Sequence, residues 1–171
     1  MSIPRIVCLD VDYRDAIAVA AGVWFRGWDA VEAEHEVVAT FDEVAPYQPG
    51  EFFRRELPCL LAVLERGPAA DLIIVDGYVW LGPGRPGLGA HLFEAQGKSK
   101  VVVGVAKTKF QGATDAIPVY RGESHSPLYI KAEGIDQAEA AASVIDMHGP
   151  YRVPTQLRRV DQLARTSYGK A

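Results

Sequence analysis

The chain has 171 residues, of which 49% are hydrophobic and 23% are charged, so it is long enough for one well-packed core and has ordinary globular composition. Its net charge of −4 excludes a uniformly basic surface, so any contact with nucleic acid must be local. Cys8 and Cys59 lie in apolar segments without a metal-binding spacing. No apolar run reaches the roughly 20 residues that cross a bilayer, and the N-terminus lacks a signal-peptide layout. We expect a cytoplasmic protein that does not contact a membrane.

Five segments have the character of β-strands, because they are apolar or alternate between apolar and polar residues and are bounded by turn residues. They cover residues 6–11, 16–25, 30–40, 71–76 and 100–105. The short turns between the first three predict an antiparallel meander, and a helical segment between the last two predicts a parallel crossover. Two shorter segments, at residues 118–120 and 128–131, could form a further hairpin.

Helical spacing of apolar residues is found at residues 51–66, 90–96, 137–147 and 153–164. Within the first of these, Pro58 predicts a kink or an early helix turn. An antiparallel trio followed by strand, helix and strand is the pattern of an RNase H-like α/β fold with a mixed five-stranded sheet flanked by helices. We see no internal repeat or linker, and therefore expect one domain over residues 1–171 that is a monomer.

Three carboxylates stand in apolar surroundings. Asp10 interrupts the run IVCLDV, Asp76 closes LIIVDG, and Glu56 lies on the apolar stripe of its helix. An ionised carboxylate in such a place costs several kcal/mol unless something positive compensates it, and oxygen ligands suit a divalent cation. As alternatives, Asp10 and Asp76 could cap turns, and Glu56 could pair with Arg54 or Arg55. Neither arginine is three or four residues from Glu56, where helical partners meet.

At these residues the sequence resembles the endonuclease V family of DNA and RNA repair nucleases. The resemblance rests on five blocks between residues 7 and 165 that follow the order of the family. The blocks are LDVDYRDAIAVAAGV, PYQPGEFFRRELPCLL, LIIVDG with the later GLGAHL, VVVGVAKTKFQG, and GPYRVPTQLRRVDQLAR. Five blocks in one order indicate common ancestry.

The resemblance implies a metal-dependent endonuclease that cleaves a strand 3′ to a deaminated base such as hypoxanthine. It implies that Asp10, Glu56 and Asp76 hold one or two Mg²⁺ or Mn²⁺ ions. It also implies that Lys107 contacts the scissile phosphate and offsets charge that develops in the transition state. As an alternative, Lys107 is a plain surface lysine. The expected partner is nucleic acid, with DNA favoured over RNA.

A base-recognition site is implied as well. Tyr47 corresponds to a tyrosine that wedges into the strand beside the lesion; otherwise it is a loop aromatic that packs on the domain. The residues that would receive the flipped base, besides the loop after Lys107, are Gln48, Pro49, Gly50, Gly77 and Tyr78.

Three histidines of the family are absent, and Tyr78, Gly82 and Gly134 take their places. This difference motivates two alternatives. One is a nuclease with a changed substrate, in which Tyr78 and Trp80 stack on a different base. The other is a catalytically weak nucleic-acid-binding module on the same fold, although such a module has no need for acids that repel phosphate. Seven basic residues could contact phosphates or form a scattered solvated surface: Arg85, Lys98, Lys100, Lys109, Arg152, Arg158 and Arg159.

Overall fold

The computed structural model describes residues 3–42, 53–113 and 115–168. The strands are β1 (Arg5–Arg14), β2 (Ile17–Arg26), β3 (His35–Phe41), β4 (Leu72–Asp76), β5 (Trp80–Gly82), β6 (Arg85–Pro86), β7 (Val101–Ala106), β8 (Ile117–Val119) and β9 (Leu128–Glu133). The helices are α1 (Phe53–Arg66), α2 (Leu88–Ala95), α3 (Gln137–Ile145) and α4 (Thr155–Thr166). Within these ranges, no helix is both long and apolar enough to span a bilayer.

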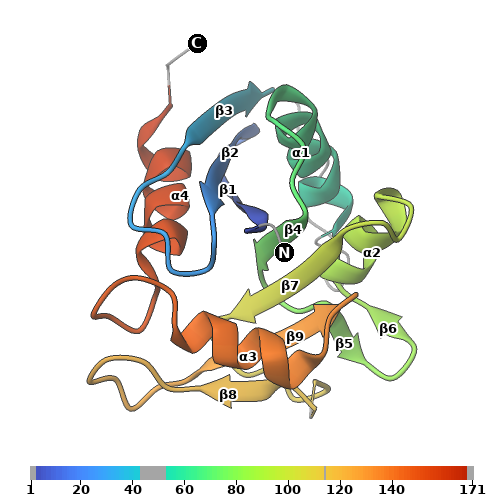
Figure 1. The fold of residues 1–171 in the computed structure, drawn as a ribbon. Coiled ribbons are helices and arrows are strands. Elements are labelled where there is room, and N and C mark those ends of the chain that lie inside the picture. Colours follow the sequence, from blue (N-terminus) through green and yellow to red (C-terminus); the bar gives the residue numbers. More distant parts are fainter. Residues whose placement is uncertain (1–2, 43–52, 114, 169–171) are drawn as a thin grey trace.

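The main sheet has the strand order β3-β2-β1-β4-β7-β9-β8 (Figure 1). The predicted meander is confirmed: β1 is antiparallel to β2, and β2 to β3. The predicted parallel crossover is confirmed too, because β4 is parallel to both β1 and β7. The predicted hairpin of residues 118–120 and 128–131 is confirmed as β8 and β9. The prediction of a five-stranded sheet is wrong, because β9 pairs antiparallel with β7 and adds this hairpin to the sheet. The predicted third strand begins later, at His35, since a turn from Gly27 to Ala30 precedes it.

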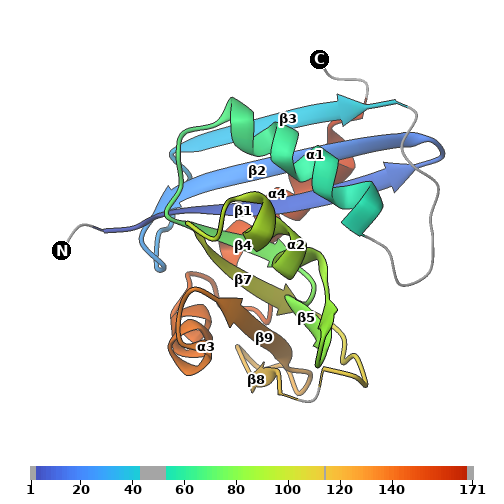
Figure 2. The ribbon, with the colours of Figure 1, turned by 90° about the vertical axis from the view of Figure 1, so that its right-hand side faces the viewer.

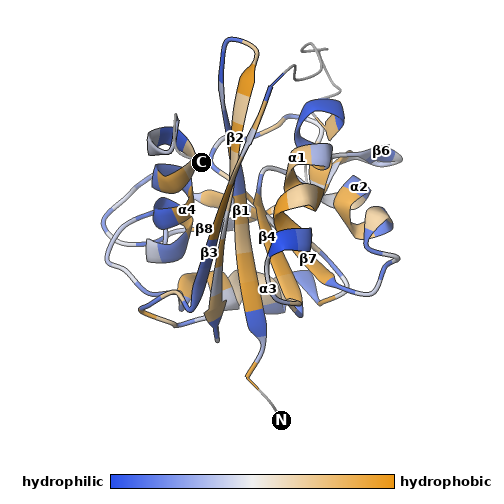
Figure 3. Cartoon of the chain, turned by 90° about the horizontal axis from the view of Figure 1, so that it is seen from above, coloured by the Kyte–Doolittle hydropathy of each residue, from blue (hydrophilic) through white to orange (hydrophobic). Residues whose placement is uncertain are grey.

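Helices cover both faces of the sheet. Figure 2 shows α1 lying across the meander and α2 over β7, and Figure 3 shows α4 on the other side of the sheet from α1 and α2. Residues 6–9 of β1 are therefore buried on both faces of the sheet. Ile6 and Cys8 pack towards α3 and α4, and Val7 and Leu9 pack towards α1 and α2, all with at most 1% of their surface exposed. Strands buried on both faces are apolar throughout, as the run IVCL is.

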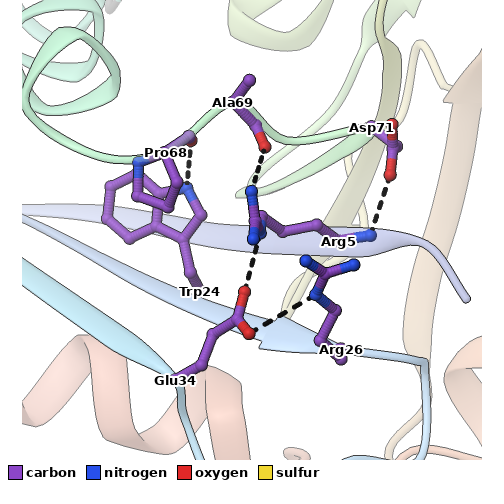
Figure 4. A network of polar contacts seen from close by, with 7 residues as sticks. All are labelled: Arg5, Trp24, Arg26, Glu34, Pro68, Ala69 and Asp71. Atoms are coloured by element: carbon purple, nitrogen blue, oxygen red, sulfur yellow. Dashed lines mark hydrogen bonds and ion pairs between the residues drawn. The ribbon is translucent and has the colours of Figure 1, made fainter.

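A polar network fixes the amino end of β1 (Figure 4). The backbone N–H of Arg5 donates to Asp71 Oδ2 at 2.9 Å, and its guanidinium donates to Glu34 at 2.7 Å and to the Ala69 carbonyl at 3.3 Å. Arg26 at the end of β2 donates to the other oxygen of Glu34 at 3.4 Å. Because these side chains are partly exposed, each ion pair adds little stability. Their effect is to align β1, β2 and the approach to β4.

Trp24 fills the space between β2 and α1. Its side chain is completely buried, and its indole N–H donates to the Pro68 carbonyl at 2.8 Å. A Cβ on Gly67 would lie 2.1 Å from Cζ2 of this ring, and one on Gly22 would lie 2.8 Å from Cζ3. Both positions must therefore lack a side chain for the indole to fit.

We predict that Gly67→Ala destabilises the protein by about 1–3 kcal/mol, because the added methyl overpacks a filled core. In the Trp24→Phe background the smaller ring leaves room, so the same substitution should cost clearly less. Urea unfolding of the two single variants and the double variant measures this coupling. Additive costs would show that Trp24 does not set the requirement for glycine.

Candidate active site

The carboxyl ends of three neighbouring strands bring polar side chains to one edge of the sheet. Leu9 lies opposite Val75 across the β1–β4 pair, so the next residues, Asp10 and Asp76, are neighbours. Lys107 directly follows β7, the strand beyond β4. Its Nζ lies 3.4 Å from Asp76 Oδ2, and both side chains are about two-fifths exposed. The sequence-predicted residues Asp10, Asp76 and Lys107 therefore meet.

A fourth acid, Asp161 on α4, joins them. Asp161 lines the same small cavity as Asp10, Asp76 and Lys107. On its outer side, Arg165 donates to Asp161 at 2.5 and 3.2 Å. The sequence reasoning did not select this residue. The sequence did contain a pattern that could have indicated Asp161. This acid lies one helical turn after the buried Leu157, next to the apolar side of α4, much as Glu56 lies next to the apolar side of α1.

Burial and mutual repulsion perturb these acids. Burial, the charge of Asp76 and the neighbouring Asp161 carboxylate together raise the pKa of Asp10 to about 8, against a smaller opposing effect of Lys107. Burial and then the charge of Asp76 raise the pKa of Glu56 to about 7, and Arg55 opposes this shift. Shifts of this kind mean that the protein does not by itself compensate the charge that these acids carry when they are ionised.

Glu56 approaches the site from the other face of the sheet, on α1. It lines a second cavity of about 530 Å³, and Asp76 lines both this cavity and the one beside Asp10. Asp76 is thus the link between Glu56 and the other acids. In the part of the chain that the structure describes, no three His, Cys, Asp or Glu side chains are already arranged closely enough to hold one metal ion. The donors are nevertheless all carboxylate oxygens, the ligand type of Mg²⁺ and Mn²⁺.

Two of the predicted base-recognition residues, Gly77 and Tyr78, line the second cavity. Gly77 lines it, with a φ of +130° that favours glycine and with open space where a side chain would be. Tyr78 lines it too, but the residue is only 9% exposed. Tyr47, Gln48, Pro49 and Gly50 lie outside the described residues.

Tyr78 and Gly134, which take the places of family histidines, do not lie together beside the acids. Tyr78 uses its hydroxyl to donate to the Thr108 carbonyl at 2.8 Å and to accept from the Phe110 N–H at 2.9 Å. Gly134 follows β9 beside Val101, at the end of β7 opposite Lys107. The place assigned to the third family histidine is therefore at the other end of β7 from Lys107 and the acids. Trp80 donates its indole N–H to Glu133 at 2.5 Å.

The seven basic residues have separate surroundings. Arg85 and Lys109 line the second cavity, and the Arg85 guanidinium lies 5.8 Å from the Phe110 ring centroid. Arg158 stands over the Tyr151 ring. Lys98 pairs with Glu94, Arg159 pairs with Glu36, Arg152 binds backbone carbonyls, and Lys100 precedes β7 at the end away from the acids.

A mixed sheet with helices on both faces and acids at the carboxyl ends of its parallel strands defines an RNase H-like α/β fold. The family model described as Endonuclease V matches residues 2–137. Endonuclease V of Streptomyces coelicolor is 34% identical over an alignment of 188 positions, which covers 95% of this chain and 78% of that protein. The chain therefore belongs to the endonuclease V family.

Solved structures agree with this assignment. The crystal structure of Endonuclease V from Streptomyces avermitilis is 30% identical, with a TM-score of 0.81 over 97% of this chain and 82% of that one. Endonuclease V of Ciona intestinalis is 15% identical and shares the fold, with a TM-score of 0.77 over 96% of this chain and 85% of that one. The Ciona protein was crystallised with a 23mer DNA containing an inosine followed by a ribo-adenosine.

We predict that Asp10→Asn stabilises the protein when divalent ions are removed by a chelator. Because folding raises the pKa of Asp10 from 3.8 to about 8, the folded state keeps a proton that the unfolded state has lost, and stability falls as the pH rises through this window. Asparagine has no such cost. The gain should be small at pH 4 and reach about 1–3 kcal/mol at pH 8, less than the full shift because water screens the site.

Thermal unfolding between pH 4 and pH 8 measures this difference, with the exposed Asp29→Asn as the control. A gain that does not change with pH would show that Asp10 is not under the electrostatic stress described above.

Proposed function

We propose that this protein is a Mg²⁺-dependent endonuclease that cleaves a nucleic-acid strand, with DNA as the favoured substrate, 3′ to a deaminated base such as hypoxanthine. The observation that carries the proposal is the meeting of Asp10, Asp76 and Asp161 beside the ammonium of Lys107. A site for binding alone has no use for acids that repel phosphate. The DNA-bound Ciona relative, whose DNA contains inosine, supports the choice of substrate.

The acids supply the oxygen ligands that a divalent cation prefers. Burial and its acidic neighbours raise the pKa of Asp10 to about 8, and a cation could replace the proton that Asp10 would otherwise keep. Asp10, Asp76 and Asp161 would hold the ion, with Glu56 reaching it from the side of the second cavity. When bound, the ion would supply a water of lowered pKa as nucleophile and would stabilise charge on the phosphate oxygens.

Lys107 would act on the phosphate directly. Its ammonium has only the single contact to Asp76 at 3.4 Å among the described residues, and about two-fifths of the side chain is exposed. A phosphate oxygen arriving at the acids would lie within reach of its remaining protons. Because charge builds up on that oxygen in the transition state, Lys107 would contribute more to the rate than to affinity.

The second cavity would receive the base. Its volume of about 530 Å³ lies within the range of small-molecule sites, and Asp76 and Glu56 border it. Gly77 lets a strand approach the backbone between this cavity and the acids. The Phe110 and Phe53 side chains supply apolar surface for an extruded base, at the cost of unstacking it.

A metal-binding prediction follows from the crowded acids. Mg²⁺ or Mn²⁺ at millimolar concentration should raise the melting temperature, since an ion that binds only the folded state stabilises it by mass action. Asp76→Asn should remove most of that increase, because Asp76 borders both cavities. An equal increase in the variant, measured by scanning calorimetry, would place the ion elsewhere.

Cleavage should depend on inosine, on the divalent ion and on Lys107. Matched DNA and RNA oligonucleotides with and without one inosine test the substrate. Lys107→Ala should lower kcat by about 10²–10³-fold while changing Kd for uncleaved DNA by no more than a few fold. Arg66→Ala, at the exposed end of α1, is the control. Losses of equal size in rate and affinity would reduce Lys107 to an ordinary phosphate contact, and a lack of cleavage of every substrate would refute the proposed activity.

A further inference from the structure

We infer that Arg152 is a positioning residue for Lys107: its guanidinium holds the backbone from which Lys107 projects into the site. This inference rests on the role proposed for Lys107. Arg152 donates to the carbonyl of Lys107 itself and to the Pro127 carbonyl at 2.9 Å. Lys107 is the first residue after β7, and Pro127 is the last before β9. One guanidinium thus joins the ends of two neighbouring antiparallel strands.

Arg152 is itself held in place by a second arginine. Arg121 is only 5% exposed, and its guanidinium donates to the carbonyls of Met147, Gly149 and Tyr151 at 2.6, 3.0 and 2.6 Å, with a longer contact to that of Arg152 at 3.3 Å. All four carbonyls belong to the segment between α3 and α4. Five fixed N–H donors allow an arginine to bind several carbonyls at once, which a lysine cannot do in the same geometry. Arg121 therefore shapes the segment that presents Arg152.

The Lys107 loop is fixed from its other side as well. The Tyr78 hydroxyl bonds to both the Thr108 carbonyl and the Phe110 N–H. The backbone from residue 107 to residue 110 is consequently held at three points by two side chains, Arg152 and Tyr78, that come from distant parts of the chain. Neither side chain needs to touch the substrate for this effect.

The chemistry explains why such support is needed. A lysine has four rotatable carbon–carbon bonds, so the position of its ammonium depends on where its backbone lies. Misplacing a catalytic group by about 1 Å can cost about 10²-fold in rate. The Lys107 ammonium must face a phosphate that also contacts the acids, and its contact with Asp76 is a long one at 3.4 Å. The carbonyl contact of Arg152 limits how far that backbone can shift.

Arg152→Lys tests the inference, because it keeps the positive charge and removes the planar fork. We expect kcat to fall by about 10–10²-fold, with Kd for uncleaved DNA changed less than threefold. Arg26→Lys is the matched control, since Arg26 also holds a polar network, at the amino end of the meander (Figure 4). If Arg152 were instead a phosphate contact, lysine would largely preserve the rate, and Arg152→Met would weaken binding and reduce its salt dependence. That result would overturn the inference.

A double-variant cycle separates positioning from general destabilisation. In the Lys107→Ala background, Arg152→Lys should lower kcat by less than twofold, because there is no longer an ammonium to position. A full further loss in that background would contradict the inference.

Amide hydrogen exchange decides the point without any nuclease assay. Exchange at the Phe110 amide, whose N–H donates to the Tyr78 hydroxyl, should accelerate at least tenfold in Arg152→Lys and in Tyr78→Phe, and should be unchanged in Arg26→Lys. If this amide exchanges at the wild-type rate in Arg152→Lys, the carbonyl contact does not hold the loop and the inference fails. If it accelerates in a protein that cleaves no substrate, the proposed activity fails while the support of the loop by Arg152 stands.

Discussion

Parallel pairing of β1 with β4 and of β4 with β7 is the constraint on which the rest of the structure depends. In parallel strands the carboxyl ends point the same way, so the register of Leu9 with Val75 forces Asp10 against Asp76. Burial first, and then repulsion by Asp76, raises the pKa of Asp10 at this edge. The fold tolerates this because the apolar faces of the same strands are buried on both sides. The buried core of the sheet stabilises the fold, and this stability offsets the cost of placing the acids together.

The two ends of β1 serve opposite purposes. At the amino end, the Arg5 guanidinium donates to the Glu34 carboxylate, and the completely buried Trp24 side chain packs tightly nearby. At the carboxyl end, the three acids Asp10, Asp76 and Asp161 lie beside a single lysine, Lys107. Lys107 is held through its carbonyl by Arg152 while its ammonium stays partly exposed. Natural proteins commonly break local rules of charge and packing at functional sites and compensate for it elsewhere. Here the compensation lies along the same strand.

Much of this could be predicted from the sequence, because a buried strand or an acid inside an apolar run is a local pattern. The five main strands were predicted in this way, and Asp10, Glu56 and Asp76 were selected in this way as candidate ligands. The hairpin of β8 and β9 was predicted as well, but its attachment to β7 was not, because pairing between strands distant in the sequence leaves no local pattern. Arg152 could only be described as a phosphate contact or a solvated surface residue, because its partner, the Lys107 carbonyl, is 45 residues away in the sequence.

The ten-residue strands of the β1–β2 hairpin have a consequence for folding kinetics. Their pairs run from Arg5 with Arg26 to Arg14 with Ile17 across a two-residue turn, so the hairpin closes over a short loop. Joining β1 to β4 instead closes a loop of 66 residues, as the contact between Arg5 and Asp71 shows. Local contacts form faster than distant ones. We therefore expect the meander to form first, before Asp76 is brought next to Asp10. The unfavourable electrostatic interaction between these acids then arises only after most of the core has formed. Pulse-labelled hydrogen exchange during refolding, with protection of β1 and β2 before β4, would show this order.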